Sequence, residues 1–236
     1  MSKETSLRKE LILAASFDFY FLQSHDYPRD RSLELVGNRY GLTVRERNVL
    51  RRGVFGHRDA LTRRGKRTTI TELENRSLTV DGHNVHITVE SAIIERVIIK
   101  GNDGALRDIA EISSGFRLTE LSLFAAEIIC KFLAGLNINE VAIYFDAPIS
   151  MSGELAKIYR ELFRKYKIKG TAQVVSVPEK QFSYEKTVIA SSDSAVIDRS
   201  NAWLDLAFLA INTEKYLIPF MDFSFLSKLW QIPDFS

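Results

Sequence analysis

The sequence predicts an α/β protein, with a mainly parallel sheet covered by helices on both faces and a small, basic, all-helical domain before it. Beyond residue 70, short runs that are apolar throughout alternate with helical patterns, as buried parallel strands do. Before residue 70, the apolar residues follow helical spacing. Charge separates the two parts as well. Residues 1–70 hold 15 Lys and Arg against 8 Asp and Glu, and the remainder holds 17 against 22.

Length and composition exclude several classes of protein. The 236 residues, 45% of them hydrophobic, are enough to bury a core. A single cysteine, Cys130, excludes a disulfide framework and a multi-cysteine zinc site. No apolar run approaches the roughly 18 residues of a membrane-spanning helix, and the N-terminus does not read as a signal peptide. We therefore expect a cytoplasmic protein without a membrane partner.

The first domain is expected over residues 1–70 and contains three predicted helices. Residues 7–23 form the first, 30–40 the second, and 44–53 the third. The second is ended by Gly41. Thr43 and Glu46 form a capping box at the start of the third. The faces expected to be buried comprise Leu11, Ala14, Ala15, Asp18, Phe19 and Leu22 in the first helix, Leu33, Val36 and Tyr40 in the second, and Val44, Val49 and Leu50 in the third.

Arginines dominate the third helix and the segment after it. Two short helices joined by a glycine-containing turn suit a helix-turn-helix, and a plain helical module with a basic face suits the same pattern. In either case Arg45, Arg47, Arg51 and Arg52 are the expected phosphate contacts, unless the basic face is simply solvated. Residues 58–67 are expected to be an exposed basic linker.

The second domain is expected over residues 71–212, and an aromatic tail over 213–236. Strands are predicted at 77–80, 96–100, 141–145, 171–177 and 187–190, and helices at 89–94, 119–135, 152–165 and 202–211. The tail contains Tyr216, Phe220, Phe223, Phe225, Trp230 and Phe235. We expect this tail to pack on the body rather than to form an exposed partner surface.

Three of the predicted strands lead directly into an aspartate: Asp81, Asp146 and Asp193. Ligands of open α/β sheets bind beyond the carboxyl ends of the strands, where these side chains can converge if the strands are neighbours. Converging carboxylates repel one another unless a cation or a shared proton compensates. Oxygen ligands select Mg²⁺ or Mn²⁺ over zinc. Such a site would position and deprotonate a water and stabilise charge on a phosphodiester. The alternative for each aspartate alone is a turn or helix cap.

Small polar residues surround these aspartates. Gly82 allows a close backbone approach directly after Asp81. We expect Asn84, Ser192 and Ser194 to orient ligands or substrate. His83 and His86 are expected on extended chain, where they would face opposite sides.

The stretch from Val80 to Val85, Asp-Gly-His-Asn within it, resembles the opening motif of NYN domains, a branch of the PIN-like ribonucleases. The stretch from Ile189 to Ser194 is similar to their later strand, which ends in Ser-x-Asp-Ser. The whole chain also resembles a prokaryotic family of unknown function that joins a short helical N-terminal domain to a PIN-like C-terminal one. The segments that match are residues 34–40, 80–90, 144–154 and 191–199, and the resemblance covers about residues 5–210.

The resemblance implies a PIN-like sheet, a divalent metal held by Asp81, Asp146 and Asp193, and cleavage of RNA. The chain departs from the pattern at Ala195, where these domains carry a second aspartate. The fourth acidic ligand is therefore open. Its candidates are Asp198, Glu154 and Asp108, the last from the predicted turn at 104–108. Glu154 also suits a helix cap. Separately, Arg117 is a candidate phosphate contact.

Two functions follow from these features. The first is a metal-dependent ribonuclease, with Mg²⁺ or Mn²⁺ as cofactor and RNA as partner. The second is a non-catalytic nucleic-acid-binding protein whose acidic site is degenerate, as the alanine at position 195 allows.

Overall fold

The computed structural model describes residues 7–109, 117–213 and 221–229. The chain forms two compact units, each assembled from separate stretches of sequence. Unit 1 contains Met1–Gly65, Ile98–Ile109 and Pro219–Ser236. Unit 2 contains Lys66–Val97 and Ala110–Ile218. None of the helices in the described stretches is both long and apolar enough to cross a membrane.

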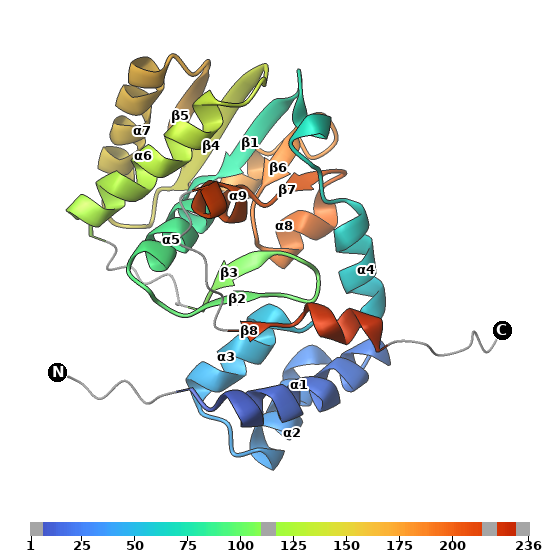
Figure 1. The fold of residues 1–236 in the computed structure, drawn as a ribbon. Helices are drawn as coiled ribbons and strands as arrows, with labels where there is room; N and C mark the ends of the chain where they lie inside the picture. Colours follow the sequence, from blue (N-terminus) through green and yellow to red (C-terminus); the bar gives the residue numbers. More distant parts are fainter. Residues whose placement is uncertain (1–6, 110–116, 214–220, 230–236) are drawn as a thin grey trace. The chain divides into compact units, whose positions relative to one another are not determined.

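Unit 1 packs helices with a small sheet (Figure 1). Its helices are α1 (Lys9–Ser24), α2 (Arg29–Arg39), α3 (Val44–Gly53) and α4 (His57–Gly65), and its strands are β2 (Ile98–Lys100), β3 (Leu106–Asp108) and β8 (Met221–Asp222), followed by the 3-10 helix η3 (Ser224–Lys228). In the sheet, β2 lies in the middle, antiparallel to β3 and parallel to β8. An N-terminal helical region is therefore confirmed, although it does not stand alone.

The predicted ends of these helices are confirmed. Thr43 accepts the backbone N–H of Glu46, and the Glu46 side chain accepts that of Thr43, which completes the capping box of α3. Gly41 has a φ of +56°, the left-handed conformation that ends α2.

The predicted buried faces are partly wrong. In α1, Ile12, Ser16 and Tyr20 are buried, and Ala14 is exposed. The observed stripe also contains Ala15 and Phe19 and keeps the three-and-four spacing. It is rotated around the helix relative to the predicted face, because it includes Ser16 and Tyr20, whose side chains carry hydroxyl groups. Leu11, Asp18 and Leu22 in α1, and Tyr40 after α2, are only partly buried, and Val44 in α3 is 74% exposed.

The predicted basic linker at 58–67 is also wrong. Most of this segment is helix α4, and Arg63 is buried within unit 1. The reason is a distant partner, because the Arg63 guanidinium donates to Asp103 at 3.3 Å. Similarly, the predicted turn at 104–108 ends in strand β3, which pairs with β2.

Residues 221–229 of the predicted tail belong to unit 1, whereas Thr213 ends α9 in unit 2. Phe223 and Leu226 are fully buried, and the ring of Phe225 lies 5.5 Å from that of Phe17. Tyr216, Phe220, Trp230 and Phe235 lie outside the described residues.

Unit 2 is built on a five-stranded sheet whose strands are all parallel, in the order β5-β4-β1-β6-β7 (Figure 1). This confirms the predicted α/β class and the mainly parallel sheet. The strands are β1 (Ser77–Asp81), β4 (Glu140–Asp146), β5 (Gly170–Val175), β6 (Val188–Ala190) and β7 (Trp203–Leu204). The helices are α5 (Gly82–Ile93), α6 (Glu120–Ala134), α7 (Ser152–Tyr166), α8 (Ser194–Arg199) and α9 (Leu206–Thr213), with short 3-10 turns η1 (Thr71–Leu73) and η2 (Pro178–Lys180).

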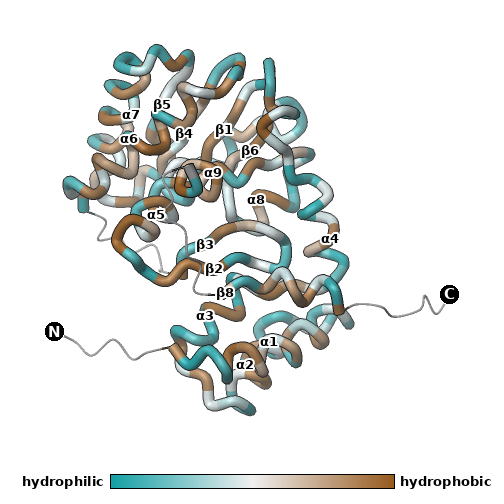
Figure 2. The backbone as a smooth tube through the Cα atoms, in the orientation of Figure 1, coloured by the Kyte–Doolittle hydropathy of each residue, from teal (hydrophilic) through white to brown (hydrophobic). Residues whose placement is uncertain are grey.

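Different elements cover the two faces of this sheet. One face carries Val141, Ile143 and Phe145, and the Phe145 ring packs 5.3 Å from Tyr159 of α7. On the other face Ile189 packs with Phe182 and Val196 of α8, among other side chains. Figure 2 shows the strands largely in hydrophobic colours, whereas the turns of α7 alternate between hydrophobic and hydrophilic, as expected for an amphipathic helix.

Two predicted elements of unit 2 need correction. Helix α5 begins directly after Asp81, so His83 and His86 lie three residues apart on a helix rather than on extended chain, and both are buried. The segment 202–211 begins as strand β7, because Trp203 pairs with Ile189 of β6, and α9 starts only afterwards.

Candidate metal centre

The three predicted aspartates lie at the carboxyl ends of three neighbouring strands of unit 2. β1 is the middle strand, and it pairs with β4 on one side and β6 on the other. Asp81 is the last residue of β1 and pairs with Tyr144 of β4. Asp146, the last residue of β4, lies two residues further along that strand. Asp193 follows β6 by three residues. The chain places β4 and β5 on one side of β1 and then β6 and β7 on the other, so the strand order reverses beside β1, where α/β proteins bind ligands.

Asp81 is the buried member of this group. Its residue is 8% exposed, and its Oδ2 accepts a hydrogen bond from Ser191 Oγ at 2.9 Å. Burial, together with the charges of Asp146 and Asp193, raises the pKa of Asp81 to about 7 against the hydrogen bonds of Ser191 and Asn84, which lower it. Asp146 and Asp193 are therefore close enough to Asp81 for their charges to disfavour its ionised form.

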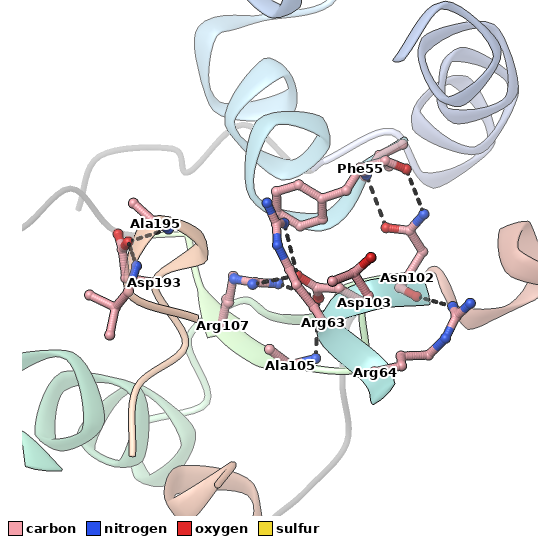
Figure 3. Close-up of polar contacts among 12 residues, drawn as sticks. Phe55, Arg63, Arg64, Asn102, Asp103, Ala105, Arg107, Asp193 and Ala195 are labelled. Atoms are coloured by element: carbon pink, nitrogen blue, oxygen red, sulfur yellow. Dashed lines mark hydrogen bonds and ion pairs between the residues drawn. The ribbon is translucent and has the colours of Figure 1, made fainter. Parts of the chain in front are cut away.

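Ser191 links Asp81 to Asp193. While its hydroxyl donates to Asp81, it also accepts the backbone N–H of Asp193 at 3.1 Å. Asp193 is the N-cap of α8, where Oδ1 accepts the N–H groups of Ala195 and Val196 at 2.8 and 3.2 Å (Figure 3). Asp193 therefore has the helix-capping role that the sequence offers as the alternative to a metal ligand. The cap uses Oδ1, and within the described residues Oδ2 of Asp193 has no hydrogen bond.

His83 orients Asp146. The Asp146 backbone N–H donates to His83 Nδ1 at 3.0 Å, and Asp146 Oδ2 lies 3.1 Å from the same nitrogen. A neutral ring that accepts at Nδ1 carries its proton on Nε2, which lies 3.4 Å from Ser152 Oγ. Because His83 is fully buried, this contact fixes the end of β4 against the first turn of α5.

Asn84 and Gly82 complete the start of α5. Asn84 Oδ1 accepts both the backbone N–H and the hydroxyl of Ser192, at 2.7 and 3.0 Å, which ties α5 to the loop after β6. A Cβ on Gly82 would lie 2.6 Å from the Phe145 ring and 2.7 Å from the Tyr144 carbonyl oxygen. The close backbone approach predicted for this glycine is therefore confirmed.

The other three candidate acidic ligands lie on other parts of the chain. Asp198 is exposed on the last turn of α8, where its carbonyl oxygen accepts from Lys66. Glu154 is exposed in the first turn of α7. Asp108 lies on β3 in unit 1, with its carboxylate 3.8 Å from Arg52. Within the described residues, no three side chains among His, Cys, Asp and Glu are arranged to hold a metal ion between them.

Two other predicted substrate contacts, Ser194 and Arg117, belong to unit 2. Ser194 is the first residue of α8, directly after the Asp193 cap. Arg117 is exposed just before α6, and its carbonyl oxygen is 3.5 Å from Ser122 Oγ.

Some of the arginines predicted to contact phosphate are engaged inside unit 1. Arg47 donates to the carbonyl oxygen of Leu42 and to the side chain of Asn38. Arg51 pairs with Asp30 at 2.9 Å, Arg52 with Asp108, and Arg45 is partly buried.

A buried charge cluster lies elsewhere in unit 1. Asp103 receives two hydrogen bonds from Arg107, at 2.7 and 2.8 Å, and one from Arg63 (Figure 3). Burial would raise the pKa of Asp103, but Arg107 and Arg63 outweigh it and hold the pKa below its ordinary value. Both guanidinium groups also lie over the Phe55 ring, at 4.3 Å for Arg63 and 4.9 Å for Arg107. Part of the positive charge of residues 1–70 is therefore structural.

Sequence reasoning missed two residues of the site, His83 and Ser191. Both are adjacent to a predicted residue in the same motif, so their position was a usable signal. For His83 the sequence predicts only a structural or supporting role on extended chain, whereas the residue lies on helix α5 and contacts Asp146.

The sequence matches known families over most of its length. Residues 70–208 match the family described as "Domain of unknown function (DUF5616)", and residues 11–66 match "Protein of unknown function (DUF434)". The chain is 30% identical over 190 residues to the uncharacterised protein MJ0935 of Methanocaldococcus jannaschii, covering 79% of this chain and 89% of that protein. No solved structure matches.

Proposed function

The chain belongs to the family described as "Domain of unknown function (DUF5616)", and we propose that it is a metal-dependent ribonuclease of the PIN-like, NYN type. The reaction is hydrolysis of phosphodiester bonds in RNA with Mg²⁺ or Mn²⁺ at Asp81, Asp146 and Asp193. One observation carries the proposal: three aspartates lie at the carboxyl ends of three adjacent parallel strands, where the charges of Asp146 and Asp193 act on the buried carboxyl group of Asp81.

The donor set fits a hard divalent cation. A cation would offset the charges of Asp146 and Asp193, which disfavour the ionised form of Asp81 beyond the effect of its burial. Mg²⁺ usually keeps several waters and takes one or two carboxylates together with substrate phosphates. When bound, such a cation lowers the pKa of a coordinated water and stabilises negative charge on a phosphate.

The chain's own residues prepare this site. Asp81 is protonated at neutral pH in part of the molecules, so it releases a proton when a cation binds. Ser191 bonds both Asp81 and the backbone of Asp193, and His83 accepts the backbone N–H of Asp146. The strand order and the position of the site at the reversal beside β1 support a PIN-like arrangement.

A non-catalytic nucleic-acid-binding protein is the second candidate. Two observations favour it: no three described side chains form a metal-holding group, and Ala195 stands where the resembling domains have an aspartate. In that case Asp193 acts only as the cap of α8.

The two functions separate in a cleavage assay on labelled single-stranded RNA with Mg²⁺, Mn²⁺ or EDTA. Asp81→Asn retains an oxygen that can accept from Ser191 but loses the charge, and we expect a loss of activity of about 100-fold or more. The matched control is Glu140→Gln, because Glu140 is exposed at the opposite end of β4 from Asp146. Equal cleavage by wild type and Asp81→Asn would indicate a contaminant and exclude the ribonuclease. Calorimetric titration with Mn²⁺ gives a readout independent of activity.

A further inference from the structure

A basic groove runs along β5, the edge strand of the sheet in unit 2. Its volume is about 930 Å³, and α7, the turn after it and β5 supply its walls. We define the β5 groove by its four basic lining residues, Arg160, Arg164, Lys167 and Lys169. The described residues that line it include no aspartate or glutamate.

The local sequence builds this groove. Residues 157–169 contain six lysines and arginines and one glutamate. Arg160 and Arg164 lie one turn apart on α7 and so share a face. Lys167 then adopts a left-handed conformation, with φ of 56°, and ends the helix before β5. At the start of β5, a Cβ on Gly170 would lie 2.1 Å from the Val141 carbonyl oxygen, so the strand approaches β4 as only glycine permits.

Within the described residues, no carboxylate neutralises the positive charge in the groove. All four basic residues are exposed, and none lies within salt-bridge distance of a carboxylate in the described part of the chain. Arg160 and Arg164 donate only to carbonyl oxygens, those of Ala172 and Arg160 respectively. Lys165 on the same helix differs, because Glu127 neutralises it at 2.8 Å. Four like charges held together without counter-charges attract a polyanion.

The groove suits a phosphate backbone better than an added β-strand from another protein. A strand from another protein that joined this edge would have to form hydrogen bonds with the free main-chain groups of β5. Arg160 already occupies the Ala172 carbonyl oxygen at 2.8 Å, which blocks part of that edge. The four basic side chains of its lining, beside apolar ones such as Ile168, instead resemble the charged grooves that track single-stranded nucleic acid.

The direction of β5 connects the groove with the candidate metal centre. β5 is parallel to β4, and the groove extends to Val174, which pairs with Phe145, one residue before Asp146. A strand of nucleic acid in the groove therefore leads toward the carboxyl edge of the sheet. We propose that the β5 groove binds the sugar–phosphate backbone of single-stranded nucleic acid and guides it to the aspartates. That the nucleic acid is RNA rests on the proposed function.

The test is fluorescence-anisotropy binding of oligouridine RNA to the full-length protein in EDTA, where no cleavage is expected. The variant Arg160→Gln/Arg164→Gln/Lys167→Gln/Lys169→Gln should bind at least about 10-fold more weakly. The slope of log affinity against log salt should fall by about 3, since each lost phosphate contact on a single strand removes about 0.7.

The matched control removes the same charge from exposed lysines of unit 2 outside the groove. It carries the changes Lys131→Gln, Lys157→Gln, Lys180→Gln and Lys186→Gln. We expect an affinity within about 3-fold of wild type for this control. Because Arg160 also bonds the carbonyl oxygen of Ala172, its loss could disturb folding, so a triple variant that retains Arg160 and changes the other three basic residues is measured as well. Far-ultraviolet circular dichroism checks that the two groove variants and the control are folded.

The outcomes keep the two proposals apart. Equal affinity losses in the groove and control variants, or wild-type binding by the groove variant, would overturn the groove proposal even if the protein cleaves RNA. Loss of binding restricted to the groove variant supports it even if no cleavage is found. Equally tight binding of polyglutamate would assign the groove to an acidic protein partner instead. Oligothymidine DNA, run beside the RNA, shows whether the sugar contributes.

Discussion

Asp81 is buried beside Asp146 and Asp193, and its pKa is raised to about 7. Between about pH 4 and pH 7 the folded protein therefore holds a proton that the unfolded chain has released. The free energy of unfolding falls as pH rises through this range, since stability falls wherever the folded state binds more protons. The difference between the ordinary pKa of 3.8 and a pKa of about 7 corresponds to about 4 kcal/mol.

Asp81→Asn removes this dependence. We expect the variant to be more stable than wild type at pH 8, by up to about 4 kcal/mol, and similar to it at pH 4. Urea unfolding at both pH values measures the difference, with Glu140→Gln as control. At pH 8, Mg²⁺ should raise the stability of wild type but not of Asp81→Asn. Parallel pH profiles for the two proteins would show that Asp81 does not carry the buried proton.

Asp103 tests the charge cluster of unit 1. Asp103→Asn leaves Arg63 and Arg107 buried without their carboxylate, and we expect a loss of about 3–5 kcal/mol. Asp222→Asn is the matched change, because its pair with Lys100 is partly exposed and should contribute about 1 kcal/mol or less. Chemical denaturation reports both. Similar small losses would mean that the buried cluster does not stabilise unit 1.

The strand-end aspartates could be predicted because their signal is local: an apolar run, then Asp, then small residues. Arg63 could not. Its partner Asp103 is 40 residues away, and nothing near Arg63 distinguishes a buried arginine from a solvated one. Ser191 lies between these cases, since it occurs inside the motif but its role depends on contact with Asp81.

At the scale of elements, the start of α5 is the feature that shapes the site. The sequence suggested a helix only near residue 89, because β-branched residues and histidines obscured its first turns. In the structure, close packing of Gly82 on β4 fixes where the helix begins. The strands that flank β1 were easier to predict, since they are apolar throughout, but their order depends on contacts that no local pattern contains.

Two glycines at helix starts test this packing. Gly82→Ala places a methyl group against the Phe145 ring, and we expect a loss of about 1–3 kcal/mol together with weaker Mn²⁺ binding. Gly153→Ala in the first turn of α7 meets no atom within 4 Å and should stabilise the protein by up to about 1 kcal/mol. Thermal unfolding and Mn²⁺ titration distinguish them. If both glycines tolerate alanine equally, packing at Gly82 does not position Asp81.

At the scale of the whole molecule, the compact units cross the boundary that sequence suggests. The two family matches adjoin between residues 66 and 70, and the charge change predicts a division at 70. The β2–β3 hairpin lies inside the family match over residues 70–208, but in the structure it belongs to unit 1. Strand β8 belongs to unit 1 as well. The pairing of Ile99 with Met221 spans more than half the chain, so no window of sequence contains both partners.

This division predicts which shortened chain folds. A chain of residues 66–218 retains the bonds of Lys66 and Thr68 to Trp203, which a start at residue 71 would remove. It still carries the β2–β3 hairpin, whose Ile99 and Leu106 are fully buried in the whole protein. Helix α3 of unit 1 packs close to Ile99, since a Cβ on Gly53 would lie 3.1 Å from its Cδ1. Without unit 1 these side chains become exposed, and we expect aggregation and binding of a hydrophobic dye.

Replacing residues 98–109 by a Gly/Ser linker of the same length should remove that exposed surface without straining the connection. We expect this second chain to be monomeric, to unfold cooperatively and to retain Mn²⁺ binding at the three aspartates, all of which lie in unit 2. Size-exclusion chromatography, urea unfolding and metal titration compare the two chains directly. If the chain with the native hairpin is equally soluble and cooperative, the hairpin does not depend on unit 1, and the predicted division near residue 70 describes the folding units better.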